Sequence, residues 1–139
     1  MIGSPDRPLQ DHDYERLLAF RTELRDFLRW SERAAHEAGL TPSLHQLLLA
    51  VRGHPVKRPP SIADVAQQLH MRHHSAVELS QRAEAGGLLE RNRDPVDSRL
   101  IHLRLTSRGQ GQLEALTREH LTRIQALARV LTGVTGAGP

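Results

Sequence analysis

Residues 61–105 read SIADVAQQLHMRHHSAVELSQRAEAGGLLERNRDPVDSRLIHLRL, and the period of the apolar residues changes within this stretch. The first part has helical spacing, which predicts a short helix over 61–69, a turn, and a second helix over 74–85. From residue 88 the pattern alternates, which predicts strands at 88–91 and 101–105 around a turn-rich loop. The stretch therefore predicts a helix-turn-helix followed by a two-stranded wing.

Helices are also predicted on both sides of this stretch. Residues 13–38 carry apolar side chains near helical spacing, and Gly39 ends that helix. Thr41-Pro42 then supplies an N-cap and a first-turn proline for a second helix. Ser61 with Asp64 and Ser107 with Gln110 have the spacing of a capping box, at the start of the short helix over 61–69 and of the last helix. The predicted fold class is mainly α with a small β wing.

The composition suits one domain over residues 1–139, with 38% hydrophobic residues. No apolar run approaches the roughly 20 residues of a membrane helix, and residues 1–10 lack a secretory signal. We therefore expect a cytoplasmic protein with no membrane partner. The absence of cysteine excludes disulfides and thiolate metal ligands. Lys57 is the only lysine, so every other fixed positive charge is an arginine. A GC-rich genome explains this bias over the whole chain, but the positions of the arginines are still informative.

The second helix of the pair is a candidate recognition helix. Its start is polar and compact, and the positive end of a helix faces phosphates favourably. In a major groove, Arg pairs with guanine, Gln with adenine, and Glu accepts from cytosine. A helix pair alone is common in helical domains, where it has only a structural role. The candidate DNA-contacting residues of the helix pair are Ser61, Arg72, His73, His74, Ser75, Glu78, Gln81 and Arg82.

The loop of the wing is the second candidate. Arginines on a narrow hairpin tip can enter the minor groove, where the negative potential attracts guanidinium. Arg93 and Arg99 are the arginines in question, and Asp97 is placed to turn the loop and orient an arginine. The alternative is a solvated charged loop, but this loop directly follows a candidate recognition helix.

Four segments together resemble the multiple antibiotic resistance regulator (MarR) family. They are LLERNRDPVDSR at 88–99, LTSRG at 105–109, GLTP at 39–42 and RHHSAVEL at 72–79. The resemblance implies a winged helix over about 42–105 and an obligate dimer formed by helices at about 13–38 and 107–132. It implies that Arg99, together with Arg93, enters the minor groove. Glu78 departs from the expected charge, since a carboxylate repels phosphate unless it reads a base.

The same resemblance implies an effector site between the dimerisation helices and the winged helix. Trp30 and His45 are the candidate ligand-binding residues for a small aromatic effector, although Trp30 also suits a plain core or interface position. We therefore expect a homodimeric transcription regulator that binds a palindromic operator in double-stranded DNA. Repression, with release by the effector, is the expected mode of action.

Other functional classes find less support in the sequence. His73 and His74 point about 100° apart in a helix, and His70 and His74, four residues apart, share a face only if the helix begins early. There is no HExxH motif and no second ligand cluster with zinc spacing, and isolated histidines such as His102 carry no signal. We expect no metal and no cofactor. Nucleophile-elbow, P-loop and GxGxxG motifs are absent, so we expect that the protein is not an enzyme. The alternatives left open are a winged-helix protein-interaction module and a histidine-based metal sensor.

Overall fold

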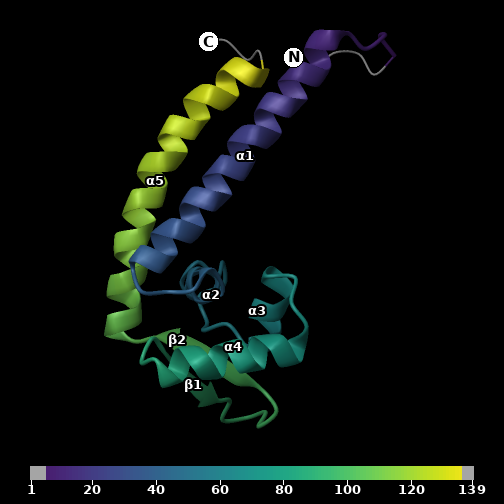
Figure 1. The fold of residues 1–139 in the computed structure, drawn as a ribbon. Helices are drawn as coiled ribbons and strands as arrows, with labels where there is room; N and C mark the ends of the chain where they lie inside the picture. Colours follow the sequence, from purple (N-terminus) through teal and green to yellow (C-terminus); the bar gives the residue numbers. More distant parts are fainter. Residues whose placement is uncertain (1–5, 136–139) are drawn as a thin grey trace. The chain divides into compact units, whose positions relative to one another are not determined.

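The computed structural model describes residues 6–135. Its elements are α1 (Asp11–Glu37), α2 (Pro42–Arg52), α3 (Ile62–Gln68), α4 (His73–Ala85), β1 (Leu89–Arg93), β2 (Ile101–Leu105) and α5 (Ser107–Thr135) (Figure 1). The predicted fold class, mainly α with a small β wing, is confirmed. None of the helices in the described range has the length and apolar character needed to span a membrane.

The described residues form two compact units. Residues 6–34 and 118–135 make up the helical unit, and residues 35–117 make up the winged-helix unit. Each unit is described by itself below. That one domain spans residues 1–139 stays a prediction.

In the helical unit, α1 and α5 contact each other through a small polar and aromatic cluster. The Oγ of Ser31 lies 2.7 Å from Nε2 of His120, and the rings of Trp30 and His120 have their centroids 4.7 Å apart. The guanidinium of Arg123 lies over the Trp30 ring. Much of the apolar surface nevertheless remains exposed, namely at Tyr14, Leu17, Leu18, Phe20, Leu24, Leu28, Leu121, Ile124 and Val130.

The winged-helix unit has an aliphatic core beneath α2, α3, α4 and the wing. Apolar residues at helical spacing form this core, because α3 packs on α4 and both contact α2. Its members include Leu47, Leu48, Val51, Ile62, Val65, Ala76, Leu79, Ala83, Leu88, Leu89 and Leu103. Leu79 and Ala83 face inward on α4, so the opposite face of α4 is left to solvent.

The turn between α3 and α4 fixes the angle of the helix pair. The N–H of Met71 donates to the carbonyl of Ala66 at 2.8 Å, and His70 adopts a positive φ of 53°. This is the Schellman arrangement that commonly ends helices, with His70 at the position where glycine is usual. Helix α4 starts at His73, one residue earlier than predicted.

The wing is an antiparallel pair in which Leu89 faces Leu105, Arg91 faces Leu103 and Arg93 faces Ile101. Side chains alternate between the two faces of a strand, so the leucines lie over the core. Leu89 and Leu103 are both buried. The strands therefore anchor the wing at its base, and the connecting loop projects from the end of β1.

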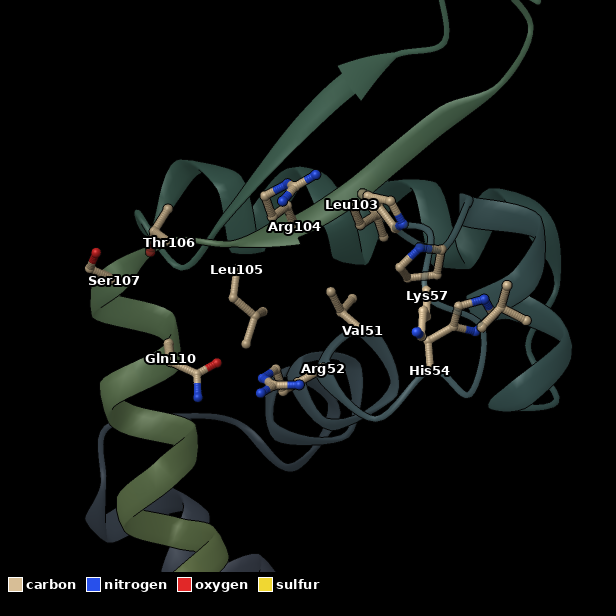
Figure 2. Close-up of a pocket in the computed structure, with 13 residues that line it drawn as sticks. Val51, Arg52, His54, Lys57, Leu103, Arg104, Leu105, Thr106, Ser107 and Gln110 are labelled. Carbon is tan, nitrogen blue, oxygen red and sulfur yellow. The ribbon is translucent and has the colours of Figure 1, made fainter.

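Thr106 joins β2 to α5 (Figure 2). Its Oγ1 accepts from the N–H of Gly109 at 3.0 Å and donates to the carbonyl of Gly87 at 2.7 Å. Thr106 is therefore the N-cap, and the prediction of Ser107 as the capping residue was wrong. The physical reason is that the Thr106 hydroxyl satisfies a helix donor and the preceding turn at the same time.

Gly109 lies so close to the turn after α4 that a side chain does not fit. A Cβ there would stand 2.0 Å from the carbonyl oxygen of Leu88, which is backbone and cannot swing away. We expect Gly109→Ala to lower the free energy of unfolding by about 1–3 kcal/mol, because the first turn of α5 must shift. Urea unfolding followed by circular dichroism measures this.

The matched control is Gly111→Ala, two residues along the same helix. A Cβ at Gly111 meets nothing within 4 Å. Alanine is the better helix former, so this variant should gain about 0.5–1 kcal/mol. Equal stability of the two variants would show that the close approach to Leu88 does not constrain the fold.

Candidate nucleic-acid interface

The start and outer face of α4 are open to solvent. Arg72 is the N-cap residue and makes no side-chain capping bond, and the first turn carries no acidic residue. His73 and His74 are exposed in that turn, and Ser75 is half-buried. No carboxylate of the first turn therefore neutralises the positive end of the α4 dipole.

Further along α4, the predicted outward residues also lie on the solvent face. Glu78, Gln81 and Arg82 are exposed, whereas Ala76 and Ser80 are buried on the opposite side. A braced helix with one buried and one polar face is the geometry with which helix-turn-helix proteins enter a major groove. The DNA contacts of these residues stay predictions.

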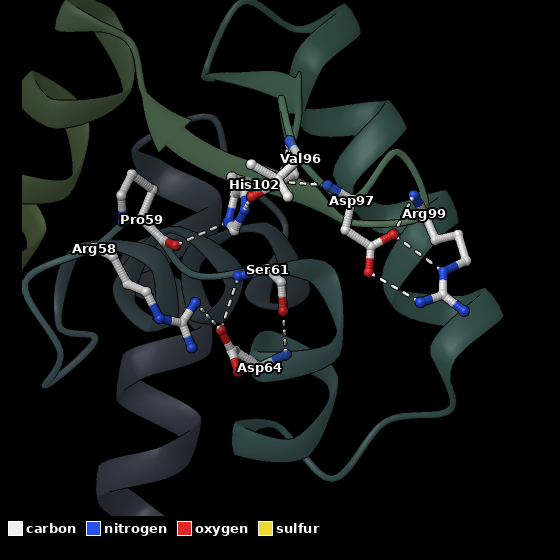
Figure 3. Close-up of polar contacts among 9 residues, drawn as sticks. Arg58, Pro59, Ser61, Asp64, Val96, Asp97, Arg99 and His102 are labelled. Carbon is white, nitrogen blue, oxygen red and sulfur yellow. Dashed lines mark hydrogen bonds and ion pairs between the residues drawn. The ribbon is translucent and has the colours of Figure 1, made fainter.

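Ser61 has a structural role that the sequence also predicted. Its Oγ accepts from the N–H of Asp64 at 3.1 Å, and the Asp64 carboxylate accepts from the N–H of Ser61 at 2.9 Å (Figure 3). Burial alone would raise the pKa of Asp64, but hydrogen bonds from Ser61 and the charge of Arg58 lower it below its ordinary value. Ser61 is buried, and its contact with DNA stays a prediction.

At the wing tip, Asp97 holds Arg99 in a two-pronged contact (Figure 3). Nε and Nη2 of Arg99 donate to the carboxylate oxygens of Asp97 at 3.0 and 3.1 Å. These hydrogen bonds lower the pKa of Asp97 and raise that of Arg99. The Arg99 side chain is 88% exposed, so Asp97 orients it, as the sequence predicted, without covering it. Arg93 is likewise exposed, at the end of β1.

A second acidic residue, Asp94, organises the loop from inside, through a partner that the sequence pattern does not indicate. One carboxylate oxygen accepts from the N–H groups of Val96 and Asp97, each at 2.8 Å. The other lies 2.7 Å from Nε2 of His102. The hydrogen bonds from Asp97, His102 and Val96 lower the pKa of Asp94 to about 2.

His102 extends this network to the segment before α3. Its Nδ1 lies 3.1 Å from the carbonyl oxygen of Pro59, and the N–H of Leu103 donates to the carbonyl of Pro60 at 2.8 Å. The ring of His102 therefore lies between two oxygen atoms, one from the loop and one from the connector before α3. We call His102, Asp94 and Pro59 the wing clasp, since they tie the loop and β2 to the start of α3.

The two candidate ligand-binding residues lie in different units. Trp30 belongs to the helical unit and contacts His120 and Phe27, whereas His45 is buried in α2 of the winged-helix unit. Their role in binding an effector stays a prediction. Within residues 6–135, no three histidine or carboxylate side chains gather as a metal site would require.

A helix-turn-helix with an exposed second helix and an arginine-bearing wing defines the winged-helix class. Residues 38–100 match the sequence profile of the MarR family. Over these residues, which make up most of the winged-helix unit, the chain is similar to the MarR family of winged-helix regulators. No curated protein sequence is significantly similar to it.

Solved structures of this family share the fold. A MarR family transcription regulator is 21% identical with a TM-score of 0.75, over 91% of this chain and 82% of that chain. AbsC, a MarR family transcriptional regulator from Streptomyces coelicolor, is 17% identical with a TM-score of 0.70, over 87% and 81%. The S. aureus MepR–DNA complex is 21% identical with a TM-score of 0.69, over 79% and 80%.

The wing clasp predicts how the loop responds to substitution of Asp94. Asp94→Ala removes every acceptor, so the amide hydrogens of Val96 and Asp97 should exchange faster. Asp94→Asn keeps an oxygen for both amides, so their exchange should stay near that of the unsubstituted protein. Hydrogen exchange followed by NMR measures this, and slow exchange in Asp94→Ala would show that the loop does not depend on Asp94.

The same carboxylate gives the loop a defined response to acid. The lowered pKa means that folding of the loop favours the ionised form of Asp94. The contribution of this carboxylate to the stability of the loop is therefore complete above its ordinary pKa of 3.8. The contribution is lost as the pH falls through about 2. Relative to the intrinsic exchange rate at each pH, exchange of the Val96 and Asp97 amides should accelerate over this pH range in the unsubstituted protein but not in Asp94→Asn.

Proposed function

We propose that this chain is a homodimeric repressor that binds a palindromic operator in double-stranded DNA. The observation that carries the proposal is that one unit exposes both a polar helix start and a wing that bears arginines. The unpaired positive start of α4 and the arginines of the wing tip belong to this one unit. Major-groove reading by α4 and minor-groove insertion by the wing follow from their shapes and charges. The MepR–DNA complex, which has this fold, supports the proposal.

The homodimer is supported by the surface of the helical unit. Among the described residues, nine large apolar side chains of α1 and α5 are exposed, from Leu18 at 65% to Phe20 at 38%. An apolar surface of this kind marks an interaction site, and helix faces with leucine at helical spacing suit a second helix pair. A second copy offers the same apolar face, so a symmetric interface would cover the exposed side chains of both copies.

Release by a small molecule completes the proposed function. A ligand that binds one spacing of the two recognition helices better than another shifts the population toward that spacing. The largest loss of DNA affinity that the ligand can cause equals the ratio of its own affinities for the two states. We place this cycle in the cytoplasm, where the operator is.

Arg99→Ala should weaken DNA binding for all sequences alike. A guanidinium in the minor groove responds to groove width and potential more than to base identity. We expect a loss of about tenfold or more at fixed salt, and a slope of log affinity against log salt that is flatter by about one unit. Fluorescence anisotropy with labelled duplexes measures both.

Arg33→Ala is the control for Arg99→Ala, because Arg33 is an exposed arginine on α1, outside the winged helix. Its DNA affinity should not change. An Arg99→Ala protein that binds DNA as well as the Arg33→Ala protein would remove the wing from the interface.

Glu78→Ala separates reading of bases from attraction to phosphate. A carboxylate in the major groove is favourable only where it accepts from cytosine or orients a neighbouring donor. We expect discrimination at one position of each half-site to fall by about 1–3 kcal/mol, with non-specific affinity kept or raised. The measurement is competition binding against every single-base variant of a bound site. An unchanged preference, with affinity raised equally for all variants, would make Glu78 a mere surface charge.

The dimer is tested without DNA. Sedimentation equilibrium at micromolar concentration should give twice the mass of the 15.6 kDa chain. Leu24→Glu places a charge on the exposed apolar face of α1 and should shift the protein toward monomer, while Glu15→Gln on the same helix should not. A monomer for the unsubstituted protein would contradict the proposed assembly.

A further inference from the structure

The loop at the tip of the wing, residues 94–100, carries apolar side chains among its charges. Pro95, Val96 and Leu100 are all exposed. Val96 is 95% exposed, more than any other large apolar residue in the part of the chain that the structure describes. Apolar surface gains free energy when a partner covers it. The wing tip therefore offers a partner an apolar contact as well as a charge.

The backbone of the loop holds Val96 in its outward position. The N–H groups of Val96 and Asp97 both donate to Oδ1 of Asp94, at 2.8 Å each. The N–H of Asp94 donates to the carbonyl of Leu100 at 2.9 Å, and the N–H of Leu100 donates to the carbonyl of Asp97 at 3.0 Å. Pro95 has a fixed φ, and the β-branched side chain of Val96 has few rotamers. A partner that contacts Val96 therefore has little left to order.

Val96 shares this loop with an open cation. Arg99 is oriented by Asp97 and its side chain is 88% exposed (Figure 3). A guanidinium is attracted into the minor groove by the negative potential there. A valine in the same groove makes no hydrogen bonds, so its fit depends on the groups that the base pairs present on the groove floor. The loop combines a side chain that is attracted to the groove with one that responds to its floor.

The floor of the minor groove differs between base pairs by one group. A·T and T·A pairs present only acceptors, whereas a G·C pair adds the 2-amino donor of guanine. This amino group occupies space in the groove, and methyl groups placed over it exclude the water that it would otherwise bind. A donor left without a partner costs free energy. The acceptors of an A·T pair, in contrast, can accept from the guanidinium of Arg99 in the same loop.

We propose that Val96 lies over the floor of the minor groove and makes the wing select base pairs that lack the guanine amino group. Val96 is then a specificity-determining residue, and Arg99 supplies affinity that depends little on sequence. This inference rests on the proposed function, because it requires that the wing binds DNA. It adds the class of base pair that the wing accepts and the side chain that rejects the other class.

The test compares three duplexes of equal length, made of alternating dA–dT, dI–dC or dG–dC. Inosine is guanine without the 2-amino group, so dI–dC resembles dA–dT in the minor groove and dG–dC in the major groove. Fluorescence anisotropy at fixed salt should give similar affinities for dA–dT and dI–dC, and an affinity for dG–dC that is weaker by about fivefold or more. Equal affinities for dI–dC and dG–dC would overturn the proposal.

Val96→Thr assigns the selection to this side chain. Threonine keeps the shape of valine and adds a hydroxyl that accepts from the guanine amino group. The ratio of the dI–dC and dG–dC affinities should fall to within about twofold. Val56→Thr is the matched control, because Val56 is the other exposed valine of the winged-helix unit and lies outside the wing. Its ratio should equal that of the unsubstituted protein.

The outcomes separate this inference from the proposed function. A ratio that stays unchanged in Val96→Thr would overturn the inference, because the selection would then come from groove shape or from Arg99. An Arg99→Ala protein should bind all three duplexes more weakly and keep the ratio. An unsubstituted protein that binds none of the duplexes and no genomic fragment would contradict the proposed function itself, and the inference with it.

Discussion

The attachment of the wing to the segment before α3 is the constraint on which the winged-helix unit depends. His102 lies between the Pro59 carbonyl and the Asp94 carboxylate, and Leu103 donates to Pro60. A two-stranded hairpin is only marginally stable alone, so the wing needs these contacts and its buried leucines. The position of the loop relative to α3 therefore follows from side chains at the base of the wing and not from its tip.

Because this attachment holds the wing at its base, Arg99 and the exposed residues of α4 do not have to stabilise the fold. Asp94 holds the loop amides, and Asp97 holds only Arg99. Arg99 is thereby oriented and still open to solvent, which limits the entropy that binding would cost. On α4 the inward leucine and alanines position the helix, and the residues at its start remain exposed.

Sequence reasoning succeeded where the interactions are local. The helices, the turn-rich loop of the wing, the Ser61–Asp64 capping box and the Asp97–Arg99 contact all depend on residues within a few positions of each other. It failed where partners are distant in the chain. His102 meets Pro59 across 43 residues, and Thr106 caps α5 instead of Ser107 because its hydroxyl also reaches Gly87, across 19 residues.

The central claim is that α4 and the wing, paired by symmetry with those of a second copy, read a specific DNA sequence. Selection of fragmented genomic DNA by the purified protein at physiological salt tests it most directly. The account predicts enrichment of an inverted repeat whose half-sites have their centres about 10 base pairs, or a multiple of that spacing, apart. Recovery of fragments with no common motif, or of none above the level of a protein without a DNA-binding site, would contradict it.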